Sequence, residues 1–413
     1  MSKLSYNLFV LFLYSFPFYT FINPGGILPF SLIFITLIFF IKFYKSLLFI
    51  DFKIPKPNKI DLLFLLFFFN SLFSVILNYS RGLNFNHVIS HFIVFFLYYF
   101  LVRIILLDNK SFFLNNDLIF KLLSNIFYLI IFSVITDLFF HYIGINLADY
   151  LPLDSRNTVF GKGFTTRARG FFVEPTDLAL ALNIFTPLLI AFNFENNNFK
   201  SIKKISFLYL LILVLSRSTS GIVQFVIGFS MIIFIYLLKK KYTRFVSKNI
   251  FSNIFKSTLI VTFTGIIALS SLITSISETS RKLEFLNSTS DSASGDVRVI
   301  YWIDSFNMFL NSDSKFLGLG TGFTTLNQKT FNWFLTVLLE NGILGLILIL
   351  LVFFFSIKSA FKMKGVYSYA FLFIYLSIFM HLMSNTGFYY PYIWLFFSLN
   401  MLILSKFEKI NFK

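Results

Sequence analysis

Cysteine is absent from this chain of 413 residues. Its absence excludes disulfide bonds, thiolate catalysis and cysteine-based metal sites. Histidine is nearly as scarce, and the histidines do not follow the spacing of a metal-binding motif; they are His87, His91, His141 and His381. We therefore expect the protein to work without a bound metal and without a cofactor.

Charged residues are also few. They make up only 13% of the chain, whereas 57% of the residues are apolar and 64 are phenylalanine. A soluble protein cannot bury so much apolar surface, but a bilayer accepts it. The composition therefore predicts an all-α integral membrane protein in contact with lipid, because helices satisfy their own backbone hydrogen bonds. We attribute the formal net charge of +17 to membrane topology and expect no nucleic-acid partner.

The apolar residues fall into blocks of about twenty, the length that crosses the hydrocarbon of a bilayer as a helix. They predict about twelve membrane spans in a single polytopic domain, residues 1–413, without an internal repeat. No small-residue cleavage site follows the first block, so we expect that block to be retained. The predicted spans are 7–22, 27–43, 60–78, 88–106, 119–141, 172–192, 205–216, 220–238, 257–274, 332–356, 367–384 and 390–405.

The loop charges predict the orientation of these spans. With both termini in the cytoplasm, 22 of the 26 lysines lie inside, as the positive-inside rule requires. The arginines behave differently, because seven of the nine then lie outside: Arg81, Arg156, Arg167, Arg169, Arg217, Arg281 and Arg298. A guanidinium group binds phosphate through two parallel hydrogen bonds, so we expect a phosphate-bearing ligand on the outer face. Ordinary solvated loop charge is the alternative for any single arginine.

Two long outer loops, residues 142–170 and 275–331, carry most of the polar residues. The first leads into the segment TTRARGFFVEPTDLALAL, where Arg167 and Arg169 precede a helix start with Glu174 and Asp177. Two acids beside two arginines suit a base and a phosphate clamp. The alternative is a salt-bridged helix start whose acids complement the helix dipole.

The second loop contains a predicted short amphipathic helix. Val299, Ile303, Phe306 and Leu310 form one apolar stripe, suited to the bilayer surface or to the span bundle. Arg298, Tyr301, Trp302 and Ser305 share a neighbouring face. Their rings would stack on sugar and the cation would meet phosphate; an interfacial aromatic anchor is the alternative.

Further along, Gly318, Gly320 and Gly322 predict a flexible turn. We do not expect it to cradle phosphate, because the next helix is predicted to start only near Asn332. Glu340 lies inside the tenth span. A carboxylate within a membrane span usually has a function, and hydrogen bonding to neighbouring helices is the alternative. Further candidates are Arg217 for phosphate, Gly342 and Gly345 for close packing, and His141 and His381 as satisfied polar residues.

The residues RARGFFVEP, the Arg-led amphipathic segment reaching GLGTG, and FNWFLTVLLENGILGL resemble the O-antigen polymerase (Wzy) and O-antigen ligase superfamily. The twelve-span layout, with its largest loop between the ninth and tenth spans, is similar too. The resemblance implies a GT-C-like membrane fold without metal or nucleotide sugar. It also implies transfer of a glycan from undecaprenyl pyrophosphate to an acceptor hydroxyl on the periplasmic face of the bacterial inner membrane. Arg169, Arg217 and Arg298 would hold the pyrophosphate.

Ligases of this superfamily commonly carry a histidine immediately before the asparagine that opens the tenth span. Here that position is Phe331, and the whole 275–331 loop lacks histidine. This departure favours a polymerase and leaves the proton acceptor to be found; Glu174 is our first candidate, with Asp177 and Asp296 behind it. A ligase and a flippase or other secondary transporter are the alternatives. A separate flippase and a chain-length regulator are expected partners of a polymerase.

Overall fold

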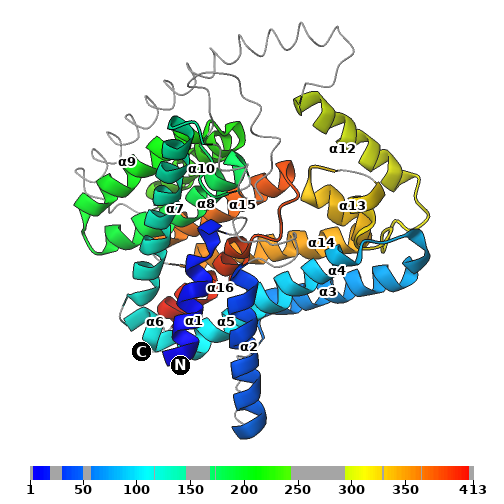
Figure 1. Ribbon diagram of the computed structural model, residues 1–413, viewed down its shortest axis with the longest axis horizontal. Coiled ribbons are helices and arrows are strands. Elements are labelled where there is room, and N and C mark those ends of the chain that lie inside the picture. Colours follow the sequence, from blue (N-terminus) through cyan, green and yellow to red (C-terminus); the bar gives the residue numbers. More distant parts are fainter. Residues whose placement is uncertain are drawn as a thin grey trace, which may run out of the picture.

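The computed structural model describes residues 3–18, 30–49, 57–115, 117–145, 168–172, 174–242, 294–327, 330–363 and 365–408. These residues are helical throughout, with short turns between helices and no strand in the described ranges (Figure 1). Of the two outer loops, 146–167 and 275–293 lie outside the described residues, and Arg167 falls there. The side chain of Asp296 is likewise outside the description.

The first half of the chain forms the elements α1 (Lys3–Tyr14), η1 (Phe16–Phe18), α2 (Phe30–Phe49), α3 (Lys59–Leu77), η3 (Tyr79–Arg81), α4 (Phe85–Phe92), the π-helical η4 (Ile93–Leu101), α5 (Val102–Asp108), α6 (Lys110–Asn115), α7 (Leu118–Tyr142) and α8 (Pro175–Glu195). The second half forms α9 (Phe199–Ser216), α10 (Thr219–Tyr242), α12 (Ser294–Leu310), α13 (Phe323–Asn327), α14 (Trp333–Lys362), α15 (Val366–Ser384) and α16 (Pro391–Glu408).

Six of these helices are long and apolar enough to cross a membrane: Lys59–Leu77, Phe85–Asp108, Leu118–Tyr142, Pro175–Glu195, Trp333–Lys362 and Val366–Ser384. Three shorter apolar stretches lie at Ser31–Tyr44, Thr219–Ile233 and Pro391–Ser405. An all-helical protein with several membrane-spanning helices is therefore confirmed. Helices also coincide with the other predicted spans except the ninth, residues 257–274, which lies outside the described residues. The total of twelve stays a prediction.

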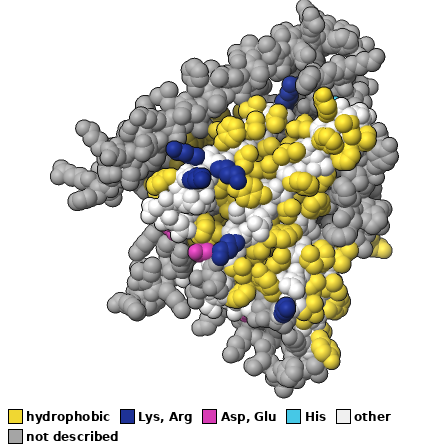
Figure 2. Space-filling view, turned by 60° about the vertical axis from the view of Figure 1, so that its left-hand side comes forward, with side chains coloured by type: hydrophobic (Ala, Val, Ile, Leu, Met, Phe, Trp, Pro, Cys, Tyr) yellow, Lys and Arg dark blue, Asp and Glu magenta, His cyan; other side chains and the backbone are white. Residues whose placement is uncertain are grey.

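The surface is apolar as well as the interior, as expected of a protein surrounded by lipid. Exposed side chains on α7 and α9 include Phe132, Ile135, Phe139 and Phe207, each more than half exposed. Figure 2 shows a face covered largely by hydrophobic side chains, with lysine and arginine at only a few places. This face would be costly in water and is stable against hydrocarbon.

Helix starts follow from local sequence. Asn58 and Asp61 form a capping box at α3, each side chain accepting from the other residue's backbone N–H. Glu174 is the N-cap of α8 and Pro175 opens it, where a missing N–H costs nothing. Asn332 caps α14 by accepting from Phe334 and Leu335. Two of these caps therefore fix the ends of helices that carry candidate site residues.

The helices pack around two central members. α8 contacts α7, α9, α10 and α15, and it is buried over most of its length. α14 packs against α3, α15, α12 and α16. Figure 1 shows α3, α4 and α14 running side by side, with α12 and α13 at the end of this group. Since α15 contacts both central helices, it joins the two groups.

The tenth predicted span is not one continuous helix, which corrects the sequence-based expectation. Gly342 has φ 69° and ψ −170°, a backbone conformation open to glycine alone, and it breaks α14. Close packing by Gly342 and Gly345 is nevertheless present, because a Cβ on Gly342 would collide with the Phe316 backbone and one on Gly345 with Asn341. The turn 315–320 fills the break.

Backbone groups on both sides of this break find partners in two other segments, as burial demands. From the turn, the backbone N–H groups of Leu319 and Gly320 donate to the carbonyls of Leu339 and Glu340 over 2.7 and 3.1 Å. From α3, Ser74 Oγ donates to the Glu340 carbonyl over 2.5 Å and Asn70 Nδ2 to the Asn341 carbonyl over 2.9 Å. Polar residues of the third span thus stabilise a defect in the tenth.

Candidate functional site

Four helix starts and one helix end meet at one end of the molecule. α8, α10, α14 and α16 begin there, and α15 ends there. The Trp333 N–H donates to the Asn385 carbonyl over 3.3 Å, which joins the start of α14 to the end of α15. Ser220 Oγ lies 3.3 Å from Ser384 Oγ, which joins the start of α10 to the same end. Segments far apart in sequence therefore converge on this point.

Two acids stand at the start of α8. Glu174 is partly exposed, and its Oε2 accepts from Thr176 Oγ1 over 2.9 Å. Asp177 is fully buried; its Oδ2 accepts a 2.6 Å hydrogen bond from the hydroxyl of Tyr390, at the start of α16. Its Oδ1 lies 3.8 Å from Nε2 of the buried His381. We call Glu174, Asp177, His381, Tyr390 and Arg298 the arginine–carboxylate site.

The negative charge of this site affects the pKa of the neighbouring phenol, Tyr389. Burial, together with the nearby carboxylates of Asp177 and Glu174, raises the pKa of Tyr389 to about 12. Tyr389 is therefore protonated at physiological pH and cannot act as a base.

Arg298 enters the site from α12, in the second outer loop. Its Nη1 donates to the Ser384 carbonyl over 3.2 Å, and its guanidinium lies 5.7 Å from the ring centre of Phe331. The Tyr301 ring packs on the same phenylalanine at 5.5 Å. Phe331 has φ 48°, in the left-handed region that bulky side chains rarely adopt. Phe331, at the position where ligases carry their histidine, thus packs against Arg298 of the arginine–carboxylate site.

The backbone segments that carry Arg169 and Arg217 lie next to each other. The Ala168 N–H donates to the Leu215 carbonyl over 3.0 Å, two residues before Arg217. Arg169 is buried, and its N–H and that of Gly170 donate to Asp137 Oδ2 over 3.3 and 3.1 Å. The sharp turn predicted at Gly170 is present, with φ 59°. Arg217 is exposed three residues before Ser220, so this pair borders the arginine–carboxylate site.

The predicted amphipathic helix is confirmed as α12. Ile303, Phe306 and Leu310 are about half exposed, so this stripe faces away from the span bundle. Ser305 is fully buried on the opposite side, and Nε1 of Trp302 is also buried. The side chain of Val299 lies outside the described residues. The polar face predicted from the sequence therefore points inward, toward α14.

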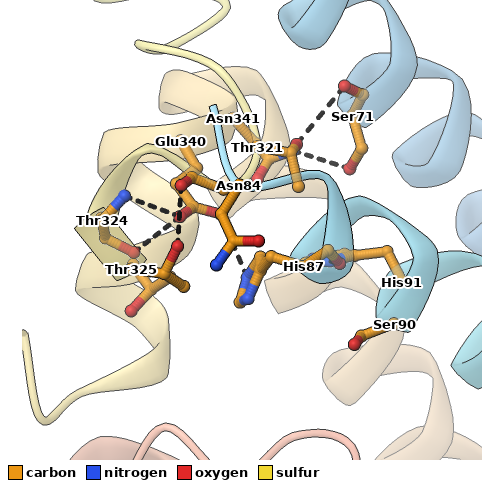
Figure 3. A network of polar contacts seen from close by, with 12 residues as sticks. Ser71, Asn84, His87, Ser90, His91, Thr321, Thr324, Thr325, Glu340 and Asn341 are labelled. Carbon is orange, nitrogen blue, oxygen red and sulfur yellow. Dashed lines mark hydrogen bonds and ion pairs between the residues drawn. The ribbon is translucent and has the colours of Figure 1, made fainter. Parts of the chain in front are cut away.

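The structure also forms a polar centre that the sequence did not reveal. Glu340 is fully buried in α14; its Oε1 accepts from the N–H and hydroxyl of Thr324, over 3.0 and 2.6 Å. Its Oε2 lies 3.3 Å from Nε2 of His87, on α4 (Figure 3). His87 and His91 are four residues apart on one helix face, a spacing that could have suggested a shared role.

The glycine turn departs from its prediction in two ways. Gly318, Gly320 and Gly322 do have positive φ, at 80°, 106° and 93°, but hydrogen bonds hold the turn in the break of α14. A short helix, α13, also begins directly after it, much earlier than Asn332. The Thr324 N–H at the start of α13 already donates to the carboxylate of Glu340. This carboxylate therefore occupies the position at the helix start that a bound phosphate would need.

The arrangement suits anion binding and acid–base chemistry. Arginines border buried and exposed carboxylates, and a hydrogen-bonded phenol lies between them. In the described ranges no group of three or more histidines, aspartates and glutamates is placed to hold a metal ion. Glu174 and Asp177 lie together at the start of α8, and Arg298 binds the end of α15, the helix whose His381 lies 3.8 Å from Asp177. Tyr390 and His87 were not predicted because long-range contacts place them.

Fold and site together define a multi-pass helical membrane protein with an arginine-lined polar site at one end of its helices. Residues 205–350, about a third of the chain, match the family described as O-Antigen ligase (Wzy_C). This match confirms the resemblance to the O-antigen polymerase and ligase superfamily, whose members transfer glycans. The matched range includes Arg217, Arg298 and Glu340. No curated protein matches the chain.

Proposed function

We propose that the protein is a glycan polymerase of the bacterial inner membrane. It would move a growing glycan from undecaprenyl pyrophosphate onto the next lipid-linked repeat unit at the periplasmic face. One observation carries the proposal: Arg298, from the outer loop, donates to the Ser384 carbonyl at the end of α15, the helix whose His381 lies 3.8 Å from Asp177 of α8. The family match over residues 205–350 supports glycan transfer as the reaction class.

In the proposed reaction the acceptor hydroxyl oxygen attacks the anomeric carbon of the donor. The bond from that carbon to the pyrophosphate oxygen breaks, and the lipid pyrophosphate leaves with the electron pair. Arg298, Arg217 and Arg169 stabilise the negative charge that develops on the leaving group. Arg167, next to Arg169 in sequence, belongs to the same proposed clamp, and the rings of Tyr301 and Trp302 would contact sugar.

The proton of the acceptor hydroxyl passes to Glu174 in this proposal. Glu174 is partly exposed at the mouth of α8, so a substrate can reach its carboxylate within hydrogen-bond distance. Asp177 is enclosed and accepts from Tyr390, so we assign it an electrostatic and positioning role behind Glu174. Asn332 supports the site by capping α14, and Gly320 and Glu340 support the turn beside it.

A ligase is the second candidate, and the description of the matching family favours it. The observation against it is Phe331, whose ring packs between Arg298 and Tyr301 where ligases commonly carry their histidine. A secondary transporter is the third candidate. Transporters use broken helices at the midplane, but the break in α14 is closed by α3 and by the turn 315–320.

We further propose twelve spans, a GT-C-like architecture and cytoplasmic termini. Contacts at the helix ends support the orientation of the spans relative to one another, because each contact joins segments assigned to the same side. Lys42 pairs with Asp108 at 2.6 Å, and Lys110 donates to the Ser405 carbonyl over 2.8 Å, all on the cytoplasmic side. On the outer side, the Asn84 N–H donates to the Gly322 carbonyl over 3.2 Å.

Deletion of the gene, followed by gel analysis of the surface glycan, tests the function. Loss of a polymerase should leave lipid A core capped by a single repeat unit. Loss of a ligase should leave bare core with polymer on its carrier, and loss of a flippase should remove single-repeat and long forms together. Either of these last two patterns would reject the polymerase.

Replacing Arg298 by lysine tests the clamp. Lysine keeps the charge but loses the planar fork, so we expect chain extension to fall about 10-fold or more. Arg81→Lys is the matched control, because Arg81 is an exposed outer arginine remote from the proposed clamp residues in sequence. Equal chain length in the wild type and both variants, at equal expression, would exclude Arg298 from the clamp.

A further inference from the structure

His87 and Glu340 form a polar pair that the proposed reaction does not use. The pair joins α4 to α14, and Nε2 of His87 lies 3.3 Å from Glu340 Oε2. The two side chains differ in access: that of Glu340 is 1% exposed, and that of His87 is 15% exposed. The imidazole therefore stands between a buried carboxylate and the outside of the protein.

The carboxylate of Glu340 is fixed before any ligand arrives. Two donors from Thr324 hold its Oε1, and the broken backbone of α14 is anchored by α3 and the turn 315–320. Its second oxygen is thereby held toward His87 (Figure 3). A carboxylate on one ring nitrogen sets the tautomer, so that neutral His87 carries its proton on Nε2.

The other ring nitrogen of His87, Nδ1, is then the one left to meet a ligand. Within the part of the chain that the structure describes, Nδ1 of His87 has no hydrogen-bond partner, and it is not among the buried unpartnered atoms. His91 lies behind it at 4.9 Å between ring centres and is itself occupied, with Nδ1 3.0 Å from the His87 carbonyl. Of the two rings, His87 is the more exposed, and it is therefore the one that meets a ligand.

An aromatic wall separates this pair from the arginine–carboxylate site. Phe388 lies 5.5 Å from the His87 ring and 4.6 Å from the His91 ring, and its other neighbour is Trp333, stacked at 5.5 Å. Trp333 in turn bonds through its backbone to Asn385, next to Ser384. The pair is adjacent to the arginine–carboxylate site but is shielded from it, so it is not placed to take a proton at the reacting carbon.

We propose that His87, oriented by Glu340, binds a hydroxyl of the glycan at a sugar away from the reacting carbon. The chemistry selects a neutral polyol: the nearby carboxylate repels phosphate, and the pair offers too few ligands for a metal ion. A sugar hydroxyl hydrogen-bonds to Nδ1, donating to the neutral ring or accepting from the protonated ring, while apolar sugar faces suit the neighbouring aromatic wall. This assignment rests on the proposed glycan transfer and adds a second contact region to it.

The test separates binding of glycan from binding of pyrophosphate. The full-length protein in lipid nanodiscs is titrated with free repeat-unit oligosaccharide, released by mild acid from the host's lipid-linked pool, and separately with inorganic pyrophosphate. His87→Gln should weaken oligosaccharide binding about 10-fold, the cost of about one good hydrogen bond, and leave pyrophosphate binding unchanged. Glu340→Gln keeps an acceptor oxygen for Thr324 but loses the charge that orients His87, so the same selective loss is expected.

Asn86→Ala is the matched control, because Asn86 is exposed on the same helix one residue away. Unchanged oligosaccharide binding by His87→Gln would overturn the proposal. Equal weakening of both ligands would also overturn it, since a structural role predicts that result. Arg298→Lys should show the reverse selectivity, with weaker pyrophosphate binding alone. Wild-type protein that binds oligosaccharide but not pyrophosphate would reject the proposed clamp and leave this subsite standing.

Discussion

Asp177 shows how a single side chain depends on residues distant in sequence. Its carboxylate is fully buried in the first turn of α8, where the N-terminal helix dipole favours negative charge. The hydroxyl of Tyr390 donates to it over 2.6 Å across 213 positions of sequence. A hydrogen bond to a buried carboxylate contributes about 1.5–3 kcal/mol, so Tyr390 decides how Asp177 is oriented.

Tyr390→Phe removes that donor and keeps the ring. We expect glycan transfer to fall about 10- to 100-fold, because the buried carboxylate loses the hydrogen bond from Tyr390 and shifts position. Transfer can be measured with lipid-linked repeat units in proteoliposomes. Tyr79→Phe is the control, since the Tyr79 side chain is exposed. If both variants transfer at the wild-type rate, the hydrogen bond from Tyr390 to Asp177 has no part in the reaction.

At this scale the sequence predicted local features well. Arg169, Gly170, Glu174 and Asp177 adjoin one another, and their turn and helix start follow from Gly and Pro preferences. Tyr390 and His87 could not be found this way, because nothing in their own segments specifies a partner. Their roles come from packing between spans, which a single sequence does not encode in any local pattern.

Helices as elements were predictable for a simple reason: apolar runs must be helical in lipid. α12 was also predictable, since its apolar stripe and its arginine lie on different faces. The break in α14 was not. Gly342 lies in an apolar run, where glycine usually indicates close packing between helices. The non-helical backbone at Gly342 depends on contacts with α3 and the turn 315–320, which are distant in sequence.

Gly342→Ala tests the broken helix. The backbone conformation is strained for any residue with a Cβ, and that Cβ would collide with Phe316, so we expect a loss of at least about 2–3 kcal/mol in stability. Gly82→Ala is the matched control: Gly82 has φ 68°, but its Cβ would meet no atom within 4 Å, so the cost is about 1 kcal/mol. Thermal unfolding in detergent compares them. Equal shifts would contradict a closely packed break.

On the scale of the whole molecule, the helix-end contacts agree with the two sides predicted from lysine and arginine. Ion pairs and backbone bonds connect α2 to α5 and α6 to α16 at the predicted cytoplasmic ends. At the other end, α12 meets α15 and the start of α14. A wrong orientation of one helix would have joined opposite sides.

The absence of cysteine makes the orientation directly testable. Ser80→Cys, at an exposed outer position, should react with a membrane-impermeant maleimide in intact spheroplasts. Lys203→Cys, at an exposed position of α9 close to the loop that precedes this helix, should react only after the membrane is permeabilised. The cysteine-free wild type is the blank. Labelling of Lys203→Cys in intact cells would place that loop outside and reverse the topology.

The break in α14 also bears on how the protein is made. α14 leaves the ribosome long after α3, so Asn70 and Ser74 already lie in the membrane when the carbonyls of Glu340 and Asn341 enter it. An isolated α14 would present these carbonyls to hydrocarbon, at a cost of several kcal/mol for each unsatisfied group. The third span therefore acts as an intramolecular chaperone for the tenth, and a fragment that begins after residue 78 should insert α14 poorly.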